Sequence, residues 1–227
     1  MQTLELHNRS ISRILLIDDN PIIREGYEDT IEDLGIRTEE INSIRSLDEL
    51  LGFTNINDGY ICDFHLNGTT YSPVNGDVIV SNLYNMKVPA ILCSRDIETA
   101  ASVRRFRHSI PCILSARELS PDSVVASFET CIQEFSGKYS KERRPWETLL
   151  RVESLDSCSD TRARVQLVIP GWDADSLVET EISGEDISFF DKIIAGLNSG
   201  EYFRCKAKVN LDACDLKEIY IKDWVEI

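Results

Sequence analysis

The sequence predicts an α/β protein with a doubly wound, five-stranded parallel sheet, followed by a small β-rich domain. Five short, mostly apolar runs in the first 137 residues alternate with five helix-like segments over short connections, which is the pattern of parallel β–α units. Most of these runs are continuously apolar, as expected of strands that are buried on both faces. A polar break near residue 140 is followed by strand-like periodicity, and this change predicts the second domain.

The predicted strands of the first domain, taken as residues 1–137, are Arg13–Ile17, Ile36–Ile41, Gly59–Cys62, Pro89–Cys93 and Ile110–Leu114. Helix-start signals or helically spaced apolar residues follow each strand. The predicted helices are 21–34, 46–51, one through Val78 and Leu83, 97–107, and one after Ser120. Proline in the first turn, at Pro21 and Pro121, favours the first and last of these helices. Residues 1–12 are expected to form an irregular lead-in.

Residues 138–146 are polar and charged and are predicted to be a linker, so that the second domain spans 147–227. Strand-length alternating or apolar runs dominate this part, and one helix is expected at 184–198, with Gly200 beyond its end. The expected strands are 149–154, 162–169, 177–182, 202–211 and 218–227. This content favours a small β-rich domain with one helix, in the form of a partly closed barrel.

Charge and cysteine content narrow the classes of function. The chain has a net charge of −15. Residues 1–140 hold 12 basic and 21 acidic side chains, and residues 141–227 hold 12 and 18, so neither part has the basic excess typical of nucleic-acid binding. The seven scattered cysteines form no metal or redox motif and indicate a reducing compartment. With no secretory leader and no long apolar run, we expect a cytoplasmic protein.

Polar side chains stand at the carboxyl ends of three predicted strands. Asp18 and Asp19 follow the first strand, Asp63 follows the third, and Ser94 follows the fourth. In parallel sheets these ends meet at one edge, where ligands bind. Each residue alone is better explained as a helix cap or turn residue, but the joint arrangement favours a site. Carboxylates are ligands that Mg²⁺ prefers, and a carboxylate can also accept a phosphoryl group.

With this strand order and these acidic positions, residues 13–136 resemble the receiver domain of two-component response regulators, a flavodoxin-like fold. The resemblance implies that Asp63 is the phosphoacceptor and forms an aspartyl phosphate. The phosphoryl group would come from a sensor histidine kinase or a phosphotransfer protein of a phosphorelay. The resemblance also implies that the Ser94 hydroxyl assists. The implied Mg²⁺ ligands are Asp18, Asp19, Asp63 and the backbone carbonyl of His65.

The sequence departs from the family at the end of the fifth strand, where receivers have a lysine that pairs with the phosphoryl group. The segment here contains Ser115, Ala116 and Arg117 but no lysine. Two interpretations of Arg117 stay open: a displaced substitute for the lysine, or a solvent-facing residue. Arg95, directly after Ser94, is a second candidate cation. These departures bear on whether phosphorylation changes the conformation of the protein, more than on whether Asp63 accepts a phosphoryl group.

The leading interpretation is therefore a signal-transduction phosphoprotein with a non-DNA-binding output, acting through protein partners or as a phosphate sink. No enzyme activity is expected beyond self-phosphorylation and dephosphorylation. The competing interpretation is a DNA-binding transcriptional response regulator, which the acidic, strand-rich second domain disfavours. That domain can dock a protein, form a dimer or bind a small ligand. The basic cluster at Arg104, Arg105 and Arg107 is expected to be a solvated helix face, and His7, His65 and His108 are expected on the surface.

Overall fold

The computed structural model describes residues 3–68, 70–94 and 100–227. These residues divide into two compact units. The first unit holds the described residues up to Ser94 together with Ser109–Tyr139. The second holds Ser140–Ile227 and, in addition, the helix α4 (Ala100–Phe106). Within the described residues, no helix is both long enough and apolar enough to cross a membrane.

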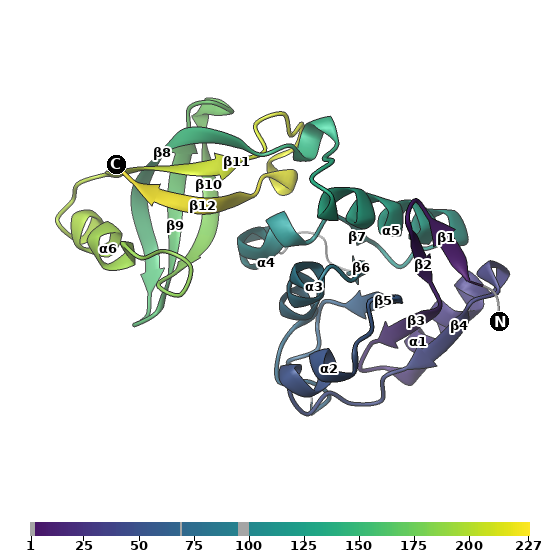
Figure 1. Ribbon diagram of the computed structural model, residues 1–227. Coiled ribbons are helices and arrows are strands. Elements are labelled where there is room, and N and C mark those ends of the chain that lie inside the picture. The colour runs from purple at the N-terminus through teal and green to yellow at the C-terminus, as the bar shows by residue number, and fades with distance from the viewer. Residues whose placement is uncertain (1–2, 69, 95–99) are drawn as a thin grey trace. The chain divides into compact units, whose positions relative to one another are not determined.

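The first unit is built on a parallel sheet whose strand order is β4-β3-β5-β6-β7 (Figure 1). Every neighbouring pair in this sheet is parallel. This order is the flavodoxin-like doubly wound arrangement, so the predicted fold class is confirmed. The strands are β3 (Arg13–Ile17), β4 (Arg37–Glu40), β5 (Asp58–Asp63), β6 (Ala90–Cys93) and β7 (Ile113–Leu114).

Four helices of the first unit cover the sheet: α1 (Pro21–Ile31), α2 (Leu47–Phe53), α3 (Gly76–Asn85) and α5 (Pro121–Phe135). Helices α1 and α5 share one hydrophobic core with alternate strand residues such as Ile14 and Ile61. Helix α3 packs on β5 and β6 and contacts α2. Side-chain caps explain where the helices begin, because the Ser46 and Ser120 hydroxyls accept hydrogen bonds from the amides three residues later.

The N-terminal residues differ from the irregular lead-in that the sequence suggested. They form a hairpin of β1 (Leu4–Leu6) and β2 (Arg9–Ile11), which packs on α5. Leu6 and Ile11 are buried in the same core as Phe128. Each strand has only three residues, which is too short for alternation to be detected in the sequence.

The second unit is built on an antiparallel sheet of order β10-β9-β8-β11-β12. Strands β10 and β12 are its two ends and do not pair with each other, so the sheet does not close into a barrel through hydrogen bonds. Helix α6 (Phe190–Asn198) begins later than the sequence suggested and buries Ile193 in the core. The strands are β8 (Trp146–Cys158), β9 (Arg162–Ile169), β10 (Asp173–Ser183), β11 (Phe203–Val209) and β12 (Ile221–Glu226).

Helix α4 packs on β10 and β12 of the second unit, although the predicted boundary assigned it to the first domain. Its basic cluster is buried, so the expected solvated face is wrong. Arg104 donates hydrogen bonds to the backbone carbonyls of Glu179 and Leu216, and Arg107 pairs with Glu218. Arg105, whose side chain is only 7% exposed, forms ion pairs with three carboxylates. These carboxylates belong to Glu181, Glu185 and Asp186.

Candidate functional site

Three of the predicted site residues lie at the carboxyl ends of adjacent parallel strands. Asp63 is the last residue of β5, and Asp18 and Ser94 directly follow β3 and β6. Strand register brings them to the same level, because Ile17 pairs with Cys62 and Asp63 pairs with Cys93. The structure therefore gathers two carboxylates and a hydroxyl-bearing residue at one edge of the sheet.

Asp18 is buried, with only 1% of its surface exposed. Its Oδ1 accepts a hydrogen bond from the Asn20 amide at 2.8 Å, and its Oδ2 accepts one from the Tyr27 hydroxyl at 3.4 Å. Its backbone carbonyl accepts a hydrogen bond from the Arg24 guanidinium at 2.5 Å. These contacts fix the Asp18 carboxylate in place at the carboxyl end of β3.

Asp63 is also buried, at the point where the chain leaves β5. Its Oδ2 accepts a hydrogen bond from the His65 amide at 2.9 Å, an Asx turn. The amide of Phe64 donates to the carbonyl of Cys93 at 2.9 Å. The backbone at His65, whose carbonyl the resemblance implies as a ligand, thus lies beside the Asp63 carboxylate, while its imidazole is exposed.

Gly76, at the start of α3, permits a close approach to Asp63. A Cβ at this position would lie 1.9 Å from the Asp63 carbonyl oxygen, well inside van der Waals contact. The Gly76 amide donates a hydrogen bond to the Phe64 carbonyl at 3.0 Å. Only glycine therefore fits where α3 begins against the carboxyl end of β5.

Two buried side chains near the carboxylates were not singled out in the sequence. Burial, followed by the charges of Asp18 and Asp63, raises the pKa of Tyr27 well above its usual value. Burial and the charge of Asp63 raise the pKa of the Cys93 thiol to about 12. Tyr27 and Cys93 are therefore neutral at physiological pH, and both lie within the field of the two carboxylates. Helical spacing marked Tyr27 only as a core residue, and nothing in the sequence linked it to Asp18.

The predicted metal ligands Asp18, Asp19 and Asp63 differ in their burial. Among the residues that the structure describes, no group of three or more acidic, histidine or cysteine side chains is arranged to hold a metal ion. Asp19 is half-buried, whereas Asp18 and Asp63 are buried. The charges of Asp18 and Asp63 both raise the pKa values of Tyr27 and Cys93. The carboxylates of Asp18, Asp19 and Asp63 and the backbone carbonyl of His65 are all hard oxygen donors.

The segment after β7, where receivers have a lysine, contains Arg117 as its positively charged residue. Leu114 pairs with Cys93 in β7 and β6, so Ser115 follows the strand at the level of Ser94. Ser94 is buried, and its amide donates to the Leu114 carbonyl at 3.0 Å. Arg117 is exposed in a turn in which the Glu118 carboxylate accepts a hydrogen bond from the Ser115 amide. The alternative cation, Arg95, lies outside the described residues.

Comparisons with known proteins find similar solved structures for about half of the chain. No protein-family model matches the chain, and no curated protein matches it. Among solved structures, a Francisella receiver domain, from response regulator 1452, is 18% identical with a TM-score of 0.41, over 55% of this chain and 98% of that one. A receiver domain protein from Clostridium thermocellum is 19% identical with a TM-score of 0.41, over 56% and 98%.

A third similar structure is a response regulator from Burkholderia pseudomallei, solved with a phosphorylated aspartic acid, a calcium ion and citrate. It is 16% identical with a TM-score of 0.40, over 56% of this chain and 71% of that one. These likenesses concern the fold of the first half of the chain, which strand order and parallel pairing establish independently. The second unit is not recognised.

Proposed function

We propose that the first unit is a receiver-type phosphoacceptor of a two-component system and that Asp63 takes a phosphoryl group from a phosphohistidine. The donor would be a sensor histidine kinase or a phosphotransfer protein. The observation that carries this proposal is the placement of Asp18, Asp63 and Ser94 at the ends of three adjacent parallel strands. Free cysteines throughout the chain support a cytoplasmic setting.

In this proposal an Asp63 carboxylate oxygen attacks phosphorus, the nitrogen–phosphorus bond of the donor breaks, and an acyl phosphate forms. Positioning and charge neutralisation carry most of such a transfer. The Asx turn holds the Asp63 carboxylate, and the Ser94 hydroxyl would donate to a phosphoryl oxygen. Gly76 leaves room beside the acceptor strand. Chemistry beyond self-phosphorylation and dephosphorylation is not proposed.

The donor set fits Mg²⁺, which takes hard oxygen ligands and is usually bound through one or two carboxylates while it keeps several waters. Asp18 and Asp63 supply the carboxylates, and the His65 carbonyl and the half-buried Asp19 complete the proposed set. When bound, the ion neutralises the charge that accumulates on the transferring group. Asp18 is held in place by the Asn20 amide and the Tyr27 hydroxyl, so the chain itself sets its orientation.

We propose a non-DNA-binding output, acting through a protein partner. The second half of the chain is acidic, and sequence-specific DNA binding usually places a helix against a negatively charged groove. Among the described residues of the second unit, the α-helices are α4 and α6, and α4 is packed against the sheet by its arginines. A sequence-specific gel shift with duplex DNA would favour a transcriptional regulator instead.

The acceptor role is tested by incubating the protein with acetyl phosphate and Mg²⁺ and measuring incorporation by intact-protein mass spectrometry. We expect one phosphoryl group, removed by hydroxylamine as an acyl phosphate and not formed in the presence of EDTA. Asp63→Asn should abolish it. Asp33→Asn, which changes an exposed carboxylate in a short 3₁₀ turn, should leave it intact. Undiminished incorporation in Asp63→Asn would rule out the proposal.

A further inference from the structure

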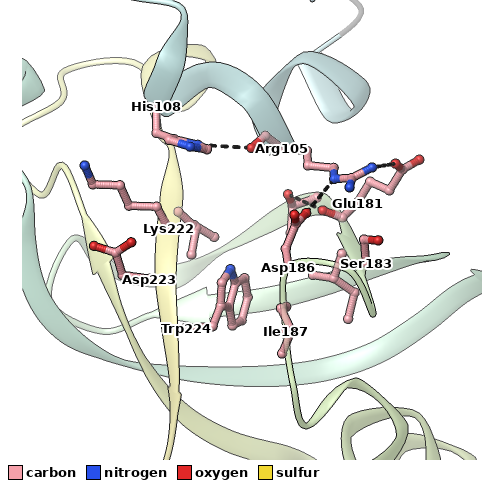
Figure 2. Close-up of a pocket in the computed structure, with 12 residues that line it drawn as sticks. Arg105, His108, Glu181, Ser183, Asp186, Ile187, Lys222, Asp223 and Trp224 are labelled. Atoms are coloured by element: carbon pink, nitrogen blue, oxygen red, sulfur yellow. Dashed lines mark hydrogen bonds and ion pairs between the residues drawn. The ribbon is translucent and has the colours of Figure 1, made fainter. Parts of the chain in front are cut away.

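A pocket of about 270 Å³ lies within the second unit. It is lined by the two edge strands of the sheet, β10 and β12, which do not pair with each other. Strand β10 contributes residues 180–183 and β12 contributes residues 221–224. The side chains of Arg105 and His108, from α4 and the turn after it, line the same pocket (Figure 2). Nothing in the proposed phosphoacceptor function uses this pocket.

The carboxylates that line the pocket have cationic partners. Arg105 lies 2.7 Å from the Asp186 carboxylate and 3.4 Å from that of Glu181. Asp223 pairs with Lys208 at 2.9 Å. Figure 2 shows Lys222 and Asp223 extending from one side of β12 and the Trp224 indole from the other. The carboxylates that line the pocket are therefore balanced by the positive charges of Arg105 and Lys208.

Two uncharged side chains that line the pocket, Trp224 and His108, remain for a ligand. Among the described residues, the indoles of Trp146 and Trp172 donate to protein oxygens, whereas no hydrogen bond of this part of the chain engages the Trp224 indole. The Nδ1 of His108 donates to the Arg105 carbonyl at 3.2 Å, which leaves Nε2 as an acceptor. Burial and the charge of Lys222 lower the pKa of His108 to about 4, so its ring is neutral at pH 7.

The backbone of β12 is irregular at the pocket. The register with β11 shifts between Lys206 and Lys208, opposite residues 222–225, and Asp223 has a φ of 53°. A bulge of this kind re-aims neighbouring side chains, and a left-handed non-glycine residue is uncommon. The bulge places Lys222 and Asp223 away from Trp224 (Figure 2) and leaves the indole as the aromatic wall of the pocket.

We propose that this pocket binds a small, uncharged, planar heteroaromatic molecule of the nucleobase or nucleoside class, stacked on Trp224. The face of the indole supplies the stacking surface, and His108 Nε2 supplies an acceptor for an N–H group at the edge of such a ring. The lining includes the carboxylates of Glu181, Asp186 and Asp223. The same lining holds the cations of Arg105 and Lys222, which are already paired or matched by these carboxylates. The pocket therefore has no excess of positive charge for a ligand with several phosphates, and the uncharged form is favoured.

The test uses the full-length protein and follows quenching of tryptophan fluorescence, with isothermal titration calorimetry as a second measurement. The probes are adenosine, guanosine, cytidine and uridine, each compared with its 5′-triphosphate and with a single-stranded oligonucleotide. We expect saturable binding of at least one nucleoside, and weaker binding of its triphosphate. Trp224→Ala should weaken that binding by about tenfold or more, because base–aromatic stacking contributes at this scale.

Trp224→Phe retains a ring without the N–H donor and guards against loss of folding in Trp224→Ala, so we expect it to bind with intermediate affinity. Trp146→Phe is the matched control, because Trp146 is exposed, its indole contacts Asp212 and it does not line the pocket. The control should bind as the wild type does. Absence of saturable nucleoside binding, binding unchanged in Trp224→Ala, or binding of the oligonucleotide alone would each overturn the proposal.

Discussion

At the scale of single residues, packing around Asp63 gives a sharp prediction for Gly76→Ala. The added methyl group would meet the Asp63 carbonyl oxygen, which is backbone and cannot move without shifting β5. We expect the free energy of unfolding of the first unit to fall by about 2–4 kcal/mol, measured by urea denaturation followed by circular dichroism. Phosphorylation from acetyl phosphate should fall with it, because the acceptor strand is displaced.

The matched control is Gly26→Ala, in the interior of α1. A Cβ at Gly26 meets nothing within 4 Å, so the change should stabilise the helix by about 0.5–1 kcal/mol. Equal effects of the two substitutions would show that the approach of α3 to Asp63 is not tight.

The positions of the candidate site residues in the fold could be predicted where a residue type and a strand end coincide, but the contacts of their neighbours could not. Asp18, Asp63 and Ser94 follow apolar runs, so elementary sheet geometry already places them at one edge. Tyr27 reaches Asp18 from a neighbouring helix, and only the packing angle of that helix decides this contact. Cys93 is buried, and its raised pKa keeps the thiol neutral, so it packs as a small apolar residue.

At the scale of secondary-structure elements, α4 shows why a correctly predicted helix can be assigned to the wrong surroundings. The local sequence around Arg104, Arg105 and Arg107 predicts a helix face exposed to solvent. Their partners are Glu179, Glu181 and Glu218, more than 70 residues further along the chain. Local periodicity carries no information about such distant contacts, so burial of these guanidinium groups could not be predicted.

The importance of α4 to the second unit can be measured with Arg105→Ala. Removing the guanidinium leaves Glu181, Glu185 and Asp186 without their shared cation. The side chains of these residues are 27%, 69% and 50% exposed, so solvent screens each pair and each contributes less than a fully buried one. We expect the second unit to lose about 1–2 kcal/mol of stability. Tryptophan fluorescence reports this unit selectively, because Trp146, Trp172 and Trp224 all belong to it.

Arg117→Ala is the control for this element-scale prediction, since Arg117 is exposed and surface substitutions usually change stability by less than about 0.5 kcal/mol. Hydrogen exchange across residues 103–108 should accelerate in Arg105→Ala and not in the control. Unchanged urea midpoints in both variants would mean that α4 adds little to the second unit.

At the scale of the whole molecule, the first sheet was predictable and the second only in outline. Five apolar runs with intervening helices restrict a parallel sheet to very few topologies, because crossovers are almost always right-handed. The second unit has antiparallel strands of up to 13 residues with register shifts, and sequence alternation does not reveal whether such a sheet closes. The discontinuity of the second unit, which includes α4, follows from contacts between segments far apart in the sequence.

The missing lysine bears on how the molecule as a whole responds to phosphorylation. An aspartyl phosphate at Asp63 needs its oxygens met by a metal ion, a hydroxyl donor and a cation. Ser115 stands level with Ser94, and serine carries no charge to draw β7 toward the site. Arg117 would have to leave an exposed turn to take that role. We therefore expect phosphorylation to leave β7 nearly unmoved, as in a phosphate sink.

Hydrogen exchange measured by mass spectrometry, with and without beryllofluoride and Mg²⁺, tests this expectation on the full chain. Residues 63–76, around the acceptor and the start of α3, should become more protected because the bound mimic orders them. Residues 110–120 should change little. Asp63→Asn should lose both responses and serves as the control for specific binding. A large gain of protection across 110–120 that disappears in Arg117→Ala would instead show that the arginine replaces the lysine and that the protein switches.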